Sequence, residues 1–141
     1  MKSNKIYTHN HNVPNQLAKI AQWHEDRNLI KGATNWTQYI KLMEEMIELF
    51  ATLNPELEPT EIGSVLRGLI RDLEVKGRIK QAPVGKDIRD DVGDINVVLI
   101  NLLEREGYSM QECLETAWDD IKDRKGQMID GIFVKEADLE K

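Results

Sequence analysis

Apolar residues recur at helical spacing through most of this sequence, and this periodicity constrains the fold more than any other feature. Between residues 36 and 53 they lie three or four positions apart, so a helix would gather them on one broad arc. The arc contains Trp36, Tyr39, Ile40, Met43, Met46, Ile47, Phe50 and Leu53. An arc this wide predicts a helix that is buried on more than one side.

Other segments show the same periodicity, and their ends carry residues that commonly start or stop helices. We predict helices at about residues 14–29, 34–53, 60–76, 83–106 and 109–126. The last of them begins with Ser109 and Glu112, the pattern of a capping box. We find no long alternating run of Val, Ile and Thr, so we expect almost no β-strand. The predicted fold class is all-α, a helical bundle of four to five helices.

With 141 residues, the chain is long enough for one domain with a core of its own. We expect a flexible tail at 1–12, a helical domain at 13–127 and a C-terminal arm at 128–141. The only cysteine, Cys113, excludes a disulfide within one chain, and we expect it to be a small core residue.

Charge and hydropathy exclude several classes of function. There are 25 acidic and 19 basic residues, and the net charge of −6 argues against a nucleic-acid partner. No apolar run reaches the roughly 20 residues that a membrane span needs. The polar N-terminus lacks the apolar segment of a secretory signal, so we expect a cytoplasmic protein without a membrane partner.

Two of the predicted helices carry dense groups of carboxylates. The groups are Glu44, Glu45 and Glu48, and then Asp87, Asp90, Asp91 and Asp94. Each group contains a pair three residues apart, and such like charges on one helix face repel unless a cation lies between them. A solvated helix face is the simplest interpretation. However, Asp91 falls on an apolar stripe, where a carboxylate needs a partner to offset desolvation.

All of these candidate ligands are oxygen donors, which suit Mg²⁺ or Mn²⁺. A di-iron bundle would need Glu-x-x-His pairs, and none of His9, His11 and His24 follows a glutamate at that spacing. Mg²⁺ in an acidic pocket indicates a phosphate substrate.

The strings KLMEEMIELF and DDVGDINVVLINL together resemble the EExxE and ExxD signature of MazG-like all-α nucleoside triphosphate pyrophosphohydrolases. The resemblance extends over about residues 23–139. It departs from the family at Asp91, where glutamate is more usual, and in the long gap between Glu48 and Asp91. It implies Mg²⁺-dependent cleavage of the α–β phosphate linkage, with release of the monophosphate and pyrophosphate. It also implies a homodimer or homotetramer.

The resemblance implies particular roles for the carboxylates. Glu45, Glu48, Asp91 and Asp94 would hold the metal. Glu44 or Glu48 would act on the attacking water, and the sequence does not choose between them.

The rest of a nucleotide site needs cations and a stacking surface. Candidates for the triphosphate are Lys41, Lys122, Arg124 and Lys125, of which Arg can make bidentate contacts. Alternatively, the last three form a basic helix end and Lys41 is an i,i+4 partner of Glu45. For the base we favour Trp36 over Trp23 and Tyr39, although each is a common core residue. Asn101 and Asn28 are weaker candidates for polar edges of the base.

Two other functions stay open at this point. A related enzyme would act on phosphoribosyl-ATP or an alarmone instead of an ordinary nucleotide. A helical binding or adaptor module would carry the same acidic faces without catalysis.

Overall fold

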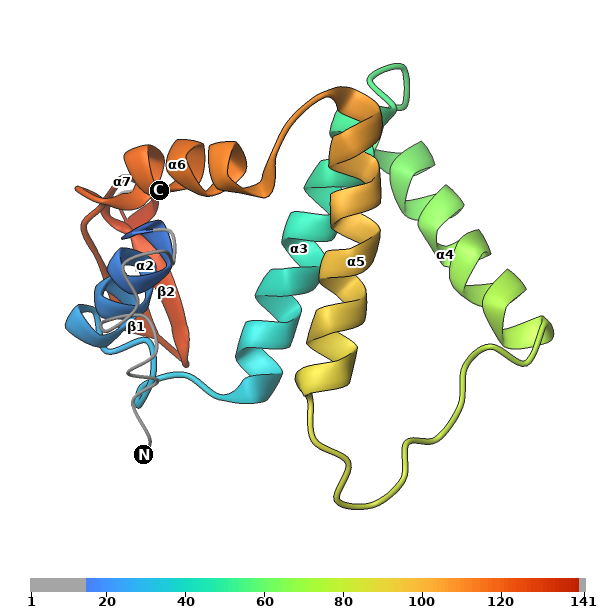
Figure 1. Cartoon of the computed structure of the whole chain (residues 1–141), viewed down its shortest axis with the longest axis horizontal. Helices are drawn as coiled ribbons and strands as arrows, with labels where there is room; N and C mark the ends of the chain where they lie inside the picture. Colours follow the sequence, from blue (N-terminus) through green and yellow to red (C-terminus); the bar gives the residue numbers. More distant parts are fainter. Residues whose placement is uncertain (1–14, 140–141) are drawn as a thin grey trace. The chain divides into compact units, whose positions relative to one another are not determined.

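A computed structural model describes residues 15–139 of the chain, and Figure 1 shows these residues as a mostly helical protein. The expected tail at residues 1–12 lies outside the described part. The elements in order are α2 (Asn15–Asp26), α3 (Asn35–Leu53), α4 (Pro59–Val75), α5 (Arg89–Glu106), α6 (Met110–Ile121), β1 (Gly126–Ile129), β2 (Ile132–Lys135) and α7 (Glu136–Leu139). The prediction of a mostly helical fold is therefore confirmed. No helix of the described part is both long and apolar enough to cross a membrane.

Three helices lie close to where the sequence predicts them. Residues of α3 and α4 match the predicted ranges within one or two positions. The start of α6 is the expected capping box: the Glu112 backbone N–H donates to Ser109 Oγ at 3.1 Å, and the Ser109 N–H donates to Glu112 Oε2 at 2.7 Å. These reciprocal bonds satisfy two backbone donors that a helix start leaves unpaired.

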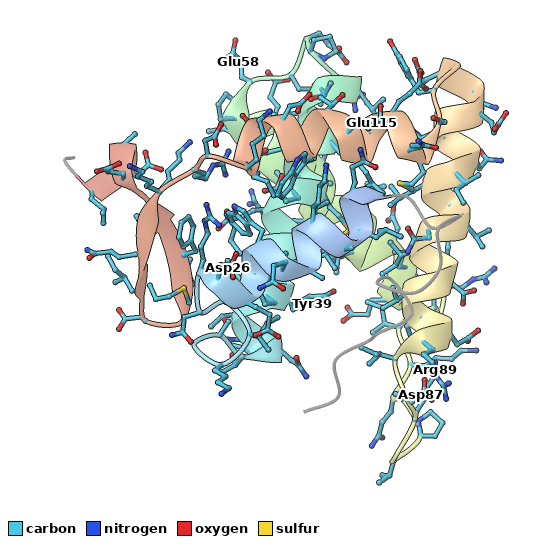
Figure 2. The ribbon with its side chains drawn as sticks, turned by 60° about the vertical axis from the view of Figure 1, so that its left-hand side comes forward. Asp26, Tyr39, Glu58, Asp87, Arg89 and Glu115 are labelled. Atoms are coloured by element: carbon cyan, nitrogen blue, oxygen red, sulfur yellow. The ribbon has the colours of Figure 1, made fainter. Side chains whose placement is uncertain are left out.

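The helix predicted from residue 83 begins six residues later, at Arg89 (Figure 2). Pro83 to Lys86 form a turn instead, in which the Lys86 N–H donates to the Pro83 carbonyl at 3.2 Å. Gly85 has a φ of 81°, a left-handed conformation that interrupts a right-handed helix. The result is a 13-residue connection over 76–88 without helix or strand.

The expectation of almost no strand is wrong at residues 126–135. There β1 and β2 form an antiparallel hairpin in which Ile129 is paired with Ile132. The two residues between them, Asp130 and Gly131, have φ values of 52° and 79°. Positive φ at both central positions defines a type I′ turn, for which Asp-Gly is a preferred sequence. The strands are only four residues long, too short for a clear alternating pattern.

Clustering of contacts divides the chain into two compact units. One contains the residues up to Thr37 together with those from Arg89 onwards, and the other is Gln38–Ile88. The first three residues of α3 therefore belong to the first unit, and the rest of α3 lies with α4 in the second.

In the first unit, α2 packs on α6, beside the hairpin (Figure 1). Trp23 of α2 is the centre of this packing and is only 7% exposed. Its Nε1–H donates to the Ile121 carbonyl at 2.9 Å, and its ring meets Phe133 edge-on at 5.6 Å. One side chain therefore ties α2 to the end of α6 and to β2.

Arg27 completes this packing through its charge. Its guanidinium lies 4.5 Å from the centre of the Trp23 ring, and its Nε donates to the Arg124 carbonyl at 3.0 Å. A second bond, at 3.4 Å, reaches the Lys122 carbonyl. Carbonyls at and beyond the C-terminal end of a helix lack intrahelical partners and carry partial negative charge, so a cation is favourable there.

Few other side chains are buried. Among residues 16–139, only Trp23 and Leu29 fall in the buried class of apolar residues. No residue of α3 is buried, and Trp36 is 73% exposed, so the prediction of a helix buried on more than one side is wrong for the single chain. Cys113 is also exposed, contrary to its expected place in the core.

Candidate functional site

The first carboxylate group lies on the middle of α3. Glu44, Glu45 and Glu48 are all exposed along this helix. Lys41 donates to Glu44 Oε2 at 2.7 Å, so its partner is the residue three positions on and not Glu45, as expected. The ion pair engages one carboxylate oxygen of the group.

The start of α3 is fixed by two threonines. The Thr37 N–H donates to Thr34 Oγ1 at 3.1 Å, and the Thr34 N–H donates to Thr37 Oγ1 at 3.0 Å. This pair satisfies a backbone donor at the helix start, as the N-cap prediction at Thr34 or Asn35 requires. It also fixes the phase of the helix, and therefore which residues share a face with Glu45 and Glu48.

The second carboxylate group lies at the start of α5. Because this helix begins at Arg89, Asp90 and Asp91 fall in its first turn, with Asp94 one turn further on. Carboxylates in a first helical turn interact favourably with the helix dipole. Asp91 and Asp94 are exposed, so the desolvation cost expected for Asp91 does not arise in the single chain. The position of Asp91 therefore has a structural explanation that does not involve a metal.

The two groups belong to different units, and each is described by itself. Among residues 15–139, no three His, Cys, Asp or Glu side chains gather in an arrangement that would hold a metal ion. Within each group, the donor chemistry fits a hard cation, since every candidate ligand is a carboxylate oxygen. Each helix offers one pair of exposed carboxylates three residues apart.

Two of the predicted phosphate-binding residues form ion pairs within the end of α6. Lys122 Nζ lies 3.3 Å from Asp119, and Arg124 lies 2.6 Å from Asp120. These pairs favour the interpretation of a basic helix end. Lys125 is exposed, and its carbonyl accepts the Glu136 N–H at 2.7 Å, which closes the hairpin.

The aromatic candidates for base stacking separate clearly. Trp23 is occupied in the packing of the first unit, so its ring is not open to a ligand. Trp36, the second residue of α3, and Tyr39 are exposed. Asn101 of α5 and Asn28 are exposed as well. Trp36 is therefore the most accessible aromatic surface among those that the sequence indicated.

Our sequence reasoning passed over the basic residues of the connection between α4 and α5. Residues 76–86 contain Lys76, Arg78, Lys80 and Lys86 and no acidic residue. The signal was present as a local run of one charge, but the predicted start of a helix at residue 83 divided it.

Comparisons with known proteins add no relative to this description: no family model, curated protein or solved structure matches the chain.

Proposed function

We propose that the chain is a Mg²⁺-dependent nucleoside triphosphate pyrophosphohydrolase that cleaves the α–β phosphate linkage of (d)NTPs. Glu45, Glu48, Asp91 and Asp94 would hold the metal. Water attacks the phosphorus, the α–β bridging bond breaks, and the products are the nucleoside monophosphate and pyrophosphate. Bound Mg²⁺ supplies charge neutralisation on the phosphate oxygens and a lower pKa for a bound water.

One observation carries the proposal: two helices each present an exposed i,i+3 pair of carboxylates within strings that resemble the paired family motifs. Repulsion within each pair would be relieved by a shared divalent cation. Acids at the start of α5 are explained by the helix dipole, but Glu45 and Glu48 lie in the middle of α3, where that explanation does not reach.

The structure also bears on the choice of general base. Lys41 engages one oxygen of Glu44 at 2.7 Å, which leaves Glu44 less available to accept a proton. This favours Glu48 over Glu44 as the residue that acts on the attacking water. Glu48 would then contribute both to metal binding and to proton transfer. Trp36 is the proposed stacking surface for the base, and Asn101 a polar contact.

We further propose that the chain acts as a homodimer or homotetramer. Large apolar side chains three or four residues apart are exposed on two helices: Val65, Leu69 and Leu73 on α4, and Val92, Ile95 and Val98 on α5. Exposed apolar rows of this kind are typical of surfaces that bury against a partner. A sedimentation mass equal to one chain would contradict this part of the proposal.

The test is pyrophosphate release from a panel of dNTPs and NTPs, with Mg²⁺ and with EDTA. The informative variant is Asp94→Asn, and the matched control is Glu104→Gln, which removes one negative charge near the other end of α5. We expect Asp94→Asn to lower the rate by more than about a hundredfold, because even the groups that support metal ligands are worth 10- to 100-fold. Glu104→Gln should stay within about twofold of the native chain.

The substrate panel separates the enzyme alternatives. Release only from phosphoribosyl-ATP or an alarmone would move the assignment to a related pyrophosphohydrolase. A chain that releases no pyrophosphate, and whose melting temperature Mg²⁺ does not change, would be better described as a binding or adaptor module. The exposed apolar rows on α4 and α5 would then be its contact surface.

A further inference from the structure

Positive charge is concentrated in one short segment of this acidic protein. The basic segment, residues 76–86, contains Lys76, Arg78, Lys80 and Lys86 and has a net charge of +4. Because the whole chain has a net charge of −6, the other 130 residues together carry −10. A segregation this strong produces a local positive potential within a negative surround.

The helix dipole explains only part of the basic segment. Helix α4 ends in a Schellman motif, with Gly77 at a φ of 68° and the Arg78 N–H donating to the Leu73 carbonyl at 2.8 Å. Lys76 and Arg78 therefore lie beside the negative end of the helix dipole. Lys80 and Lys86 lie beyond the reach of that end, which extends over about one turn, so a different reason is needed for them.

The basic segment is open to a ligand. Every residue from 76 to 86 is exposed, and Val84 makes no burying contact at all, with a relative exposure of 102%. The whole connection, drawn with Asp87 near its end in Figure 2, has 13 residues without helix or strand. Loops this long without structure of their own are uncommon in compact domains and are usually functional.

Other candidate cations of the proposed enzyme are already engaged. Lys41 is paired with Glu44, Lys122 with Asp119, and Arg124 with Asp120. A phosphate chain would have to break these ion pairs to use those side chains. Arg78 and Lys80, by contrast, lie in a stretch of 11 residues that contains no carboxylate.

We propose that the basic segment binds the phosphate chain of the substrate, with Arg78 and Lys80 as its principal contacts. The inference rests on the proposed function, which supplies a triphosphate as the ligand. Arginine suits two oxygens of one phosphate, and lysine suits a single charge on the next. A long nucleic acid is a poorer fit, because it would extend past the segment onto the acidic remainder of the chain.

The test measures binding of inorganic tripolyphosphate by isothermal titration calorimetry, in EDTA and at low ionic strength, where exposed charge pairs are least screened. The informative variant is Arg78→Gln with Lys80→Gln. The matched control is Arg67→Gln with Arg71→Gln, which removes the same charge from exposed positions of α4 in the same unit. We expect the first double variant to weaken binding about fivefold and the control less than twofold, as exposed charge pairs contribute modestly each.

Three results would overturn the inference. Equal weakening in both double variants would mean that only the overall charge matters. Unchanged binding in the segment variant would remove the segment from the site. Tighter binding of a single-stranded oligonucleotide than of tripolyphosphate, lost in the segment variant alone, would make the segment a nucleic-acid surface.

Failure of the inference and failure of the proposed function give different results. Asp94→Asn should abolish pyrophosphate release but keep tripolyphosphate affinity in EDTA within about twofold. Segment-dependent binding without any hydrolysis would leave the segment's anion site standing and refute the enzyme. Metal-dependent hydrolysis with an unchanged KM in the segment variant would retain the enzyme and refute the segment's role.

Discussion

Replacing Trp23 tests the packing of the first unit, because this one side chain joins α2, α6 and β2. A tryptophan buries up to about 250 Å² in a core, and with 7% exposure Trp23 buries nearly all of its surface. Taking about 200 Å² at about 25 cal/mol per Å², Trp23→Ala should lower the free energy of unfolding by about 5 kcal/mol. The Ile121 carbonyl also loses the donor that now lies 2.9 Å away.

A milder replacement separates the hydrogen bond from the buried area. Trp23→Phe keeps an aromatic ring but removes the Nε1–H donor, and we expect a loss of about 1–3 kcal/mol from the unsatisfied carbonyl and the smaller ring. Both variants are measured by urea denaturation followed by far-UV circular dichroism. The matched control is Trp36→Ala, which removes the same side chain from a position that is 73% exposed.

The ranking of the three variants decides the matter. We expect Trp23→Ala to cost most, Trp23→Phe less, and Trp36→Ala below about 1 kcal/mol, as is usual for exposed positions. Equal losses for the two alanine variants would refute the reasoning, because burial would then not account for the difference. A loss below about 1 kcal/mol for Trp23→Ala would show that α2 does not depend on this packing.

Three further substitutions test local features by thermal or urea unfolding. Gly131→Ala should destabilise by about 1–2 kcal/mol, since φ is 79° and the new Cβ would lie 3.2 Å from Thr37 Cγ2; an unchanged midpoint would contradict the type I′ turn. Gly68→Ala should stabilise by about 0.5–1 kcal/mol, because nothing lies within 4 Å of the added Cβ in a helix interior. Ser109→Ala should cost about 1 kcal/mol through loss of the cap on α6, whereas no loss would mean that Glu112 does not depend on it.

Helical periodicity was sufficient to predict most helices, because five of the six carry apolar residues at helical spacing. The hairpin was missed for a physical reason: four-residue strands give too few positions for alternation to be distinguished from helical spacing. Its turn was nevertheless readable, since Asp130 and Gly131 are residues that tolerate positive φ. The packing of Phe133 against Trp23 joins residues 110 positions apart, which no local pattern specifies.

The candidate site shows how a helix boundary changes the interpretation of a charged residue. With a helix from residue 83, Asp91 would lie in a helix interior on an apolar stripe, where a carboxylate indicates a bound cation. With α5 starting at Arg89, the same residue lies in the first turn, where the helix dipole favours it without any ligand. Glu45 and Glu48 have no such explanation, because α3 begins ten residues before Glu45. The carboxylates of α3 therefore provide stronger evidence for a metal than those of α5. For that reason, a variant of α3 such as Glu45→Gln is the more decisive companion to Asp94→Asn.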